Sequence, residues 1–259
     1  MFRRFATVSQ LLIVLSWQYV NMELAKRQLT HGSLFSGIGG FDLGFERVGI
    51  KTVFQVECDP YCLKVLEKHW PDVRRYTDVR TFLNERPVPP DILSGGFPCQ
   101  DISNAGKRAG ITGSRSGLWT EFRRAIVSLR PRYVVVENVA ALYQRGLSTV
   151  LGDLAQSGYD AEWDCLPAAA VGAPHLRERI WIVAYSHRPR CFQQRRPITA
   201  SEELTPFERS RWWTTEPALG RVAHGVPHRV DRLKCLGNAI VPQIAEEIGR
   251  MILAADAHA

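Results

Sequence analysis

Apolar and polar residues alternate along most of the chain with the two periods of regular secondary structure. Residues 51–56 alternate with a period of two, as a half-buried strand does, whereas Phe41, Phe45 and Val48 recur at helical spacing. Gly49 is placed to end that helix, and Pro60 lies in the first turn of another predicted helix over residues 60–69.

The same order of strands and helices continues to residue 186. Further strands are expected at residues 33–36, 91–93, 133–136, 159–166 and 180–185, and further helices at residues 116–129, 147–156 and 240–253. Alternating strands and helices predict an α/β fold with a mostly parallel sheet covered by helices. Ligands in such folds bind beyond the carboxyl ends of the strands, so the residues that follow each strand are the candidates for chemistry.

Two regions depart from this alternation. Residues 1–29 form a lead whose apolar run at 11–15 is too short to span a bilayer and precedes no small-residue cleavage pattern. Because Met22 opens a polar stretch, we expect residues 1–21 to be dispensable; an additional helix is the alternative. Residues 187–235, rich in arginine, proline and tryptophan, are expected to form a small inserted lobe. It would separate a large domain, residues 30–186, from residues 236–259, whose helix rejoins that domain.

Charge and cysteine content narrow the class of protein. The 259-residue chain carries a formal net charge of +7 and has an isoelectric point near 9.3, which favours a polyanionic partner. The six cysteines include no Cys-x-x-Cys pair, so neither a zinc site nor a disulfide framework is expected. We expect a cytoplasmic monomer with reduced thiols that binds no metal and no membrane.

Three features at successive strand ends suit a nucleoside-like cofactor. The glycine-rich turn at residues 35–40 would let the backbone approach a ligand closely. Glu57 could accept hydrogen bonds from ribose hydroxyls, and Asp78 could accept one from an adenine amino group. Each alone is more commonly a plain turn or a surface acid, and only their order along the chain favours a site. The turn departs from Gly-x-Gly-x-x-Gly, which disfavours a dinucleotide.

A thiol and a carboxylate are predicted to meet at the same edge of the sheet. Cys99 lies on a glycine- and proline-rich elbow after the strand at 91–93, where amide dipoles can lower a thiol pKa. A buried structural cysteine is the commoner alternative. Glu137 follows the strand at 133–136. Together these groups suit attack on an aromatic ring that is activated by protonation.

Five short segments occur in the order found in DNA (cytosine-5) methyltransferases. They are Phe35-Ser36-Gly37-Ile38-Gly39-Gly40, Phe97-Pro98-Cys99-Gln100, Glu137-Asn138-Val139, Arg177-Glu178-Arg179 and Gly237-Asn238-Ala239. The chain resembles that family from about residue 33 to residue 250, apart from the lobe. The probability that five ordered motifs agree by chance is negligible, although each triplet alone would be weak evidence for the family.

The resemblance implies a reaction and the residues that carry it. It implies an S-adenosylmethionine-dependent methyltransferase fold and methyl transfer to carbon 5 of a cytosine flipped out of double-stranded DNA. Cys99 would add to C6 of the ring as nucleophile, and Glu137 would bond N3 and the exocyclic amine. Arg179 would contact O2, with Arg177 beside it. The setting it implies is a bacterial or phage enzyme of the restriction–modification type.

The resemblance also assigns binding residues. Those for S-adenosylmethionine are Phe35, Gly37, Gly39, Gly40, Glu57, Asp78, Val79, Pro98, Leu118 and Asn238. Those for DNA are Gln100, Ser103, Arg115, Arg229 and Arg232. The glycine-containing stretch of residues 101–117 is expected to close over DNA, and the lobe is expected to read its sequence.

This sequence departs from the family's pattern at two positions. His175 stands where a glutamine commonly precedes the Arg-x-Arg motif, which puts the orientation of Arg177 in question. Cys58 replaces an aromatic residue after the ribose glutamate, so adenine stacking there should be weaker. The lobe is also shorter than usual for the family.

Two other functions fit the same motifs. One is an RNA cytosine methyltransferase of the same family. The other is a DNA-binding relative that keeps the fold without activity, against which the intact Cys99, Glu137 and Arg179 argue.

Overall fold

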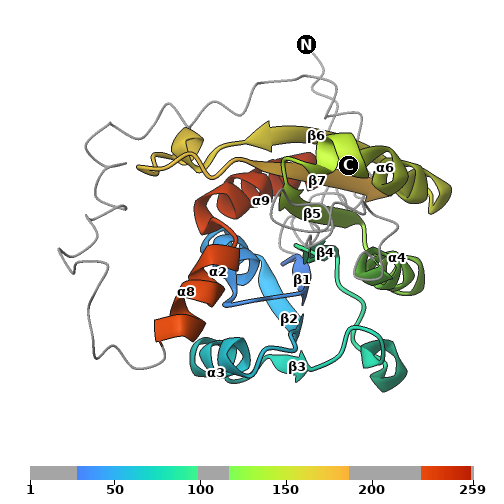
Figure 1. Ribbon diagram of the computed structural model, residues 1–259. Coiled ribbons are helices and arrows are strands. Elements are labelled where there is room, and N and C mark those ends of the chain that lie inside the picture. Colours follow the sequence, from blue (N-terminus) through green and yellow to red (C-terminus); the bar gives the residue numbers. More distant parts are fainter. Residues whose placement is uncertain (1–27, 99–116, 187–228, 258–259) are drawn as a thin grey trace, which may run out of the picture.

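The protein is built on one seven-stranded sheet, seen in a computed structural model that describes residues 28–98, 117–186 and 229–257 (Figure 1). The strand order is β3-β2-β1-β4-β5-β7-β6. The strands are β1 (Thr30–Leu34), β2 (Lys51–Val56), β3 (Arg74–Tyr76), β4 (Ile92–Gly95), β5 (Tyr133–Val139), β6 (Tyr159–Leu166) and β7 (Arg179–Ser186). This confirms the predicted α/β fold, although β1 begins earlier and β5 ends later than the sequence pattern indicated.

Most neighbouring strands are parallel, and the exceptions lie at one edge. β1 pairs in parallel with both β2 and β4, and β4 pairs in parallel with β5. β7 runs antiparallel to both β5 and β6. The chain therefore leaves β1 toward one edge and returns through β4 toward the other, which creates a crevice at the carboxyl ends of these two strands.

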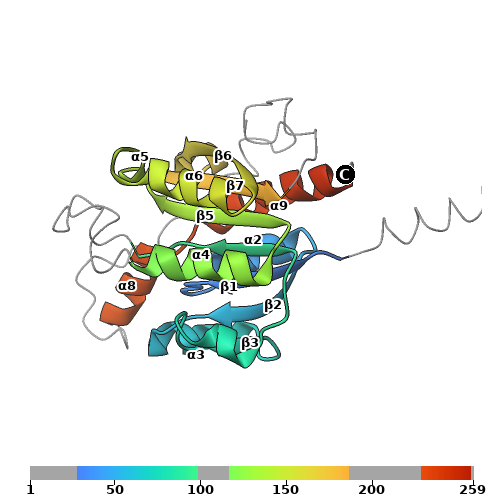
Figure 2. The same ribbon diagram turned by 90° about the vertical axis from the view of Figure 1, so that its right-hand side faces the viewer.

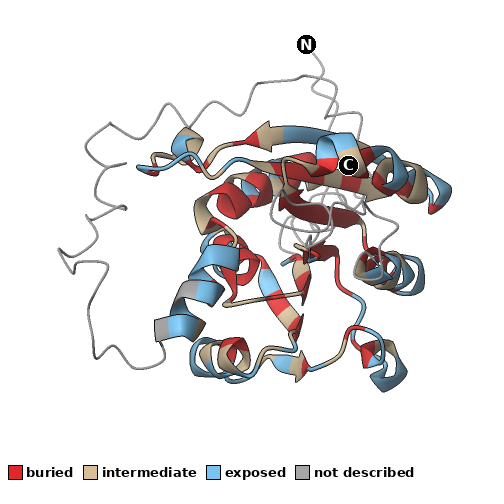
Figure 3. Ribbon diagram, in the orientation of Figure 1, coloured by how far each residue is buried: buried red, intermediate tan, exposed pale blue. Residues whose placement is uncertain are grey.

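Helices cover both faces of the sheet (Figure 2). On one face lie α2 (Gly40–Arg47) and α9 (Pro242–Asp256), and on the other lie α4 (Gly117–Leu129) and α6 (Leu147–Gln156). The short α5 (Leu142–Arg145) and the 3-10 turns η1 (Phe82–Glu85) and η3 (Ala168–Val171) complete the connections. Two apolar cores result, one on each side of the sheet, and the central strands are mostly buried (Figure 3).

Local signals fix the helix that precedes the site. In α3 (Pro60–His69) the Asp59 side chain accepts hydrogen bonds from the amides of Tyr61 and Cys62, and Pro60 occupies the first turn. A carboxylate at this position satisfies amides that have no partner inside the helix. The predicted bounds of α3, and those of α6 and β6, are confirmed.

One helix was missed by the sequence analysis. α8 (Arg229–Asn238) begins inside the region predicted as an inserted lobe and ends just beyond it, so helical structure resumes before residue 240. Its sequence is strongly polar, so it shows little amphipathic signal. The remaining lobe residues, 187–228, lie outside the described residues, as do residues 1–27.

Within the described ranges, no helix combines the length and apolar character that a membrane crossing requires.

Candidate active site

A pocket of about 500 Å³ lies at the carboxyl ends of the central strands. Its walls come from the segments that follow β1, β2, β3 and β4, together with the end of β5, the start of α4, the start of β7 and the end of α8. Its volume falls within the range of about 300–1,000 Å³ usual for small-ligand sites. The pocket occupies the crevice that the strand order creates.

The pocket brings together most of the residues predicted from the motifs. The predicted cofactor residues that line it are Phe35, Gly37, Glu57, Asp78, Val79, Pro98, Leu118 and Asn238. Glu137, Arg177 and Arg179 line it as well. Residues more than a hundred positions apart in the sequence thus share one cavity.

Gly39 and Gly40 are the predicted cofactor residues that do not line this pocket. A Cβ on Gly39 would lie 2.4 Å from the Trp70 ring, and one on Gly40 would lie 2.7 Å from both the Cβ and the carbonyl oxygen of Ile240. Both glycines therefore allow close packing of the turn against α3 and the segment before α9. Their contact with the cofactor stays a prediction.

Glu57 fixes the shape of the turn after β1. One of its carboxylate oxygens accepts a hydrogen bond from the Gly37 amide at 2.7 Å, and the other accepts from the Cys58 and Asp59 amides at 2.8 Å. Gly37 has a φ of 55°, a left-handed conformation that glycine adopts without strain. Glu57 therefore joins two strand ends that form one wall of the pocket.

Asp78 presents an ionised carboxylate on the same side of the pocket. Hydrogen bonds from the Arg80 amide and then from the Arg80 side chain lower the pKa of Asp78. Val79, which follows it, and Leu118 of α4 supply apolar surface. An acid beside apolar surface suits a flat, polar-edged ring, because the faces and the edge of such a ring need different partners.

The deeper part of the pocket contains an ion pair between Glu137 and Arg179. The Arg179 Nε lies 3.1 Å from Glu137 Oε1, and the glutamate side chain is only 11% exposed. The antiparallel pairing of β5 and β7 places Arg179 opposite Val139, two residues from the glutamate. Burial raises the pKa of Glu137 to about 7, against the opposing charges of Arg179 and Arg177. The carboxyl group can therefore hold or release a proton near neutral pH.

Gly96 has no side chain, and the Glu137 carboxyl group occupies the space that a side chain there would fill. A Cβ at position 96 would lie 2.8 Å from Glu137 Oε2, so Gly96→Ala must displace the carboxyl group from its place beside Arg179. We expect the turnover rate of Gly96→Ala to fall roughly tenfold to a hundredfold, because small displacements of a catalytic group cost rate factors of this size. The melting temperature should change little, because the end of a side chain can move.

The matched control is Gly152→Ala in α6, where an added Cβ meets no atom within 4 Å. It should keep full activity. Equal activity losses in the two variants would show that position 96 has no special relation to Glu137.

The segment that leads to Cys99 is attached to β5. The Asn138 side chain donates a hydrogen bond to the Phe97 carbonyl oxygen at 3.2 Å and accepts one from the Val139 amide at 2.8 Å. Phe97 is buried, and Pro98 lines the pocket. Cys99 itself lies outside the described residues, as do Gln100, Ser103 and Arg115.

Arg177 joins the start of β7 to the Gly237-Asn238-Ala239 motif. Its guanidinium group donates to the Gly237 carbonyl oxygen at 2.9 Å and to the Ala239 carbonyl oxygen at 2.6 Å. A guanidinium is a rigid fork of donors, which suits two acceptors at fixed spacing. Arg177 thus binds the residues on both sides of Asn238 at the pocket wall. This is the orientation of Arg177 in a chain that has His175 in place of the family's usual glutamine.

Arg177→Lys should weaken this connection, since an ammonium group cannot reproduce the fork. We expect a loss of about 1.5–3 kcal/mol in the free energy of unfolding, the usual effect of losing a charged hydrogen bond. Urea unfolding measures it, with Arg232→Lys on the exposed surface of α8 as the matched control. A loss of the same size in the control would contradict the assignment.

Of the predicted DNA residues, Arg229 and Arg232 fall on α8. Arg232 is exposed and is not among the residues that line the pocket. Sequence reasoning also missed residues: Asp59, Cys62, Lys234 and Cys235 line the pocket where α3 meets α8. Only the unrecognised helix α8 could have revealed them.

Comparison with known proteins agrees with this geometry. The chain is 33% identical over 176 residues to the type II methyltransferase M.NgoFVII of Neisseria gonorrhoeae, covering 66% of this chain and 47% of that protein. It is 35% identical over 176 residues to M1.ScrFI of Lactococcus lactis subsp. cremoris, covering 66% and 44%. The chain thus spans about half the length of the curated relatives it matches.

A solved structure shows the same fold. The methyltransferase EhMeth of Entamoeba histolytica superposes with a TM-score of 0.59 at 18% identity, covering 69% of this chain and 58% of that one. Residues 29–205 match the family model described as C-5 cytosine-specific DNA methylase. That match includes more than half of the chain and most of the residues that line the pocket, and it confirms the resemblance seen in the motifs. The chain therefore belongs to the C-5 cytosine-specific DNA methylase family.

Proposed function

We propose that this protein transfers a methyl group from S-adenosylmethionine to carbon 5 of a cytosine in double-stranded DNA. The observation that carries the proposal is the buried Glu137, held beside Arg179 in the pocket next to the segment that leads to Cys99. A carboxyl group with a pKa of about 7 at the strand end is suited to polarise a pyrimidine ring.

The residues of the pocket fit S-adenosylmethionine. Glu57 lines the wall after β2 and would face the ribose, while Asp78, Val79 and Leu118 would hold the adenine. The turn containing Phe35 and Gly37 would lie along the methionine portion. The cofactor supplies an activated methyl group, so the protein needs to provide position and charge. The exposed Cys58 leaves the adenine without an aromatic partner at that position.

The remaining pocket residues would act on the cytosine. In its protonated form Glu137 would donate a hydrogen bond to ring nitrogen N3, which draws electrons away from C6. The Cys99 sulfur would then form a bond to C6, and electron density would move to C5. Arg179, already beside Glu137, would contact O2. After methylation the C5 proton passes to water, its bonding electrons restore the double bond between C5 and C6, and the sulfur leaves C6 as a thiolate.

DNA choice is proposed to reside in the region between β7 and the motif at Gly237. Residues 187–235 are predicted to read sequence, with arginines that contact phosphates and, in some positions, guanine edges. Arg229 and Arg232 on α8 are included in that proposal. Because Arg232 is exposed and α8 ends at the pocket, this helix connects the proposed reading surface to the site.

The test is methyl transfer from labelled S-adenosylmethionine to double-stranded DNA of random sequence, followed by sequencing that distinguishes 5-methylcytosine. We expect label in DNA at cytosines that share a short sequence. Transfer RNA serves as the second substrate. Label in RNA alone would replace DNA as the substrate, and binding of DNA without label in either polymer would identify a relative without activity.

A further inference from the structure

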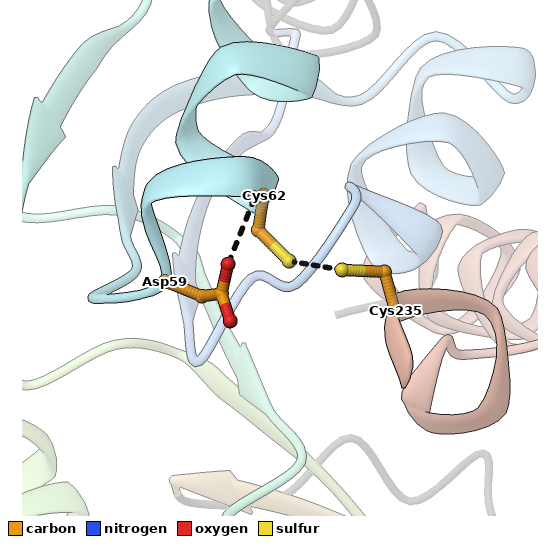
Figure 4. A group of neighbouring side chains, drawn as sticks. All are labelled: Asp59, Cys62 and Cys235. Carbon is orange, nitrogen blue, oxygen red and sulfur yellow. Dashed lines mark hydrogen bonds between the residues drawn. The ribbon is translucent and has the colours of Figure 1, made fainter. Parts of the chain in front are cut away.

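Two buried thiols face each other at the edge of the pocket. Cys62 of α3 and Cys235 of α8 point their sulfur atoms toward one another at 3.1 Å, although 173 positions separate them in the sequence (Figure 4). They are 5% and 6% exposed, and both line the pocket. The methyl-transfer chemistry proposed above uses neither of them.

The surroundings hold the two helices in this arrangement. Lys234, next to Cys235, forms an ion pair with the Asp59 carboxylate at 2.6 Å. The same carboxylate accepts hydrogen bonds from the first amides of α3. A second contact thus fixes the distance between α3 and α8 beside the thiols. Cys235 also lies two residues before Gly237, whose carbonyl oxygen is bound by Arg177.

The separation of the sulfur atoms favours a covalent bond over a metal. A disulfide requires a sulfur–sulfur distance of about 2.05 Å, so the two sulfur atoms need to approach each other by only about 1 Å more. Two thiolates on a tetrahedral zinc ion, each with a bond of about 2.3 Å, stand about 3.8 Å apart. Asp59 completes a group of three with metal-ligand chemistry. Its carboxylate is already engaged by Lys234 and the helix amides, and zinc would have to displace the lysine.

We propose that Cys62 and Cys235 form a reversible disulfide that joins α3 to α8, narrows the edge of the pocket and weakens cofactor binding. The second half of this statement rests on the proposed function, because it assumes that S-adenosylmethionine occupies the pocket. The bond itself does not depend on that assumption.

The oxidant is a peroxide, and the step balances as follows. One cysteine, as thiolate, attacks an oxygen of hydrogen peroxide; the oxygen–oxygen bond breaks, and the leaving hydroxide takes up a proton to give water. The second sulfur attacks the resulting sulfenic acid, the sulfur–oxygen bond breaks, and a second water leaves. Two thiols and one peroxide thus give one disulfide and two waters. Burial, followed by the hydrogen bond to Cys235, raises the pKa of Cys62, so little of this thiol is ionised at neutral pH and the first step is slow.

The experiment treats the full chain with hydrogen peroxide and maps its peptides by mass spectrometry without reduction. We expect a peptide pair that contains Cys62 and Cys235 and is lighter by two hydrogens than the separate thiols. Dithiothreitol should release it. Cys62→Ser and Cys235→Ser should each lack the pair. Cys165→Ser, half-buried in β6 and away from the pocket lining, should retain it.

Calorimetry of S-adenosylmethionine binding tests the consequence. Oxidation should weaken the affinity severalfold in the wild type and in Cys165→Ser, and dithiothreitol should restore it. Both serine variants at the thiol pair should be insensitive. Absence of the linked peptides, an unchanged affinity in linked protein, or one equivalent of zinc lost in both serine variants would each overturn the proposal. Failure of the reduced protein to bind the cofactor would instead count against the proposed function.

Discussion

Cys99→Ala is expected to abolish methyl transfer while leaving S-adenosylmethionine binding nearly unchanged. Without the sulfur no bond forms to C6 of the cytosine, and the ring carbon C5 is then too poor in electrons to accept a methyl group. The residues proposed to bind the cofactor's ribose and adenine, which follow β2 and β3, remain in place in this variant. Methyl transfer is measured with labelled cofactor, and binding is measured by calorimetry.

A covalent probe sharpens this prediction. DNA that carries fluorine at C5 has no proton to lose there, so the bond between sulfur and C6 should persist after methyl transfer. Wild-type protein should therefore remain attached to such DNA on a denaturing gel. Cys99→Ala should not. The matched control is Cys58→Ala, which removes an exposed thiol from the pocket lining and should keep the attachment. Attachment in Cys99→Ala would assign the nucleophile to another residue.

Glu137→Gln should lower the turnover number by roughly two or more orders of magnitude, the usual contribution of a placed acid and base. The amide keeps the shape of the side chain but cannot give up or take a proton. In the wild type the protonated form prevails below pH 7, because burial raises the pKa of Glu137 to about 7. The wild-type rate should therefore decline above that pH, and the residual rate of Glu137→Gln should show no such decline. A loss of less than threefold, with chemistry limiting, would remove Glu137 from this role.

At high pH the same substitution should raise the free energy of unfolding relative to the wild type, although it lowers activity. Since the folded pKa is about 7 and the ordinary value is 4.5, the contribution of Glu137 to stability is complete below pH 4.5 and is lost as the pH rises through 7. The loss amounts to roughly 3 kcal/mol. Urea unfolding between pH 5 and 8 should therefore show a steeper decline in the wild type than in Glu137→Gln. Asp42, buried with a pKa of about 6, titrates in both proteins and cancels in the difference.

The sequence predicted those parts of the fold that local signals determine. α3 was predicted with its observed bounds because Asp59 and Pro60 mark its start. β5 was predicted to end at Val136, but it continues to Val139 because antiparallel pairing with β7 extends the ladder. Pairing between strands about forty residues apart has no local signature, so this extension could not be read from the pattern.

Site residues that belong to motifs were predicted from the sequence. Those that reach the pocket only through the packing of helices were not. Glu137, Arg177 and Arg179 converge as expected. Gly39 and Gly40 were assigned to the cofactor by their motif, which gives no sign that they also make room for Trp70 and Ile240. The Cys62–Cys235 contact depends on α8, whose strongly polar sequence gives little amphipathic signal.

The chain between β7 and α8 is anchored at both of its ends, and this has a consequence for how such proteins diversify. β7 ends at Ser186 within the sheet, and α8 is held to α3 by Lys234 and to β7 through Arg177. Since these anchors lie in α3, in α8 and at the start of β7 and not in the intervening chain, recombination could replace that chain without rebuilding the pocket. Lineages could then acquire a new target sequence by exchanging one genetic segment, while the chemistry is inherited unchanged.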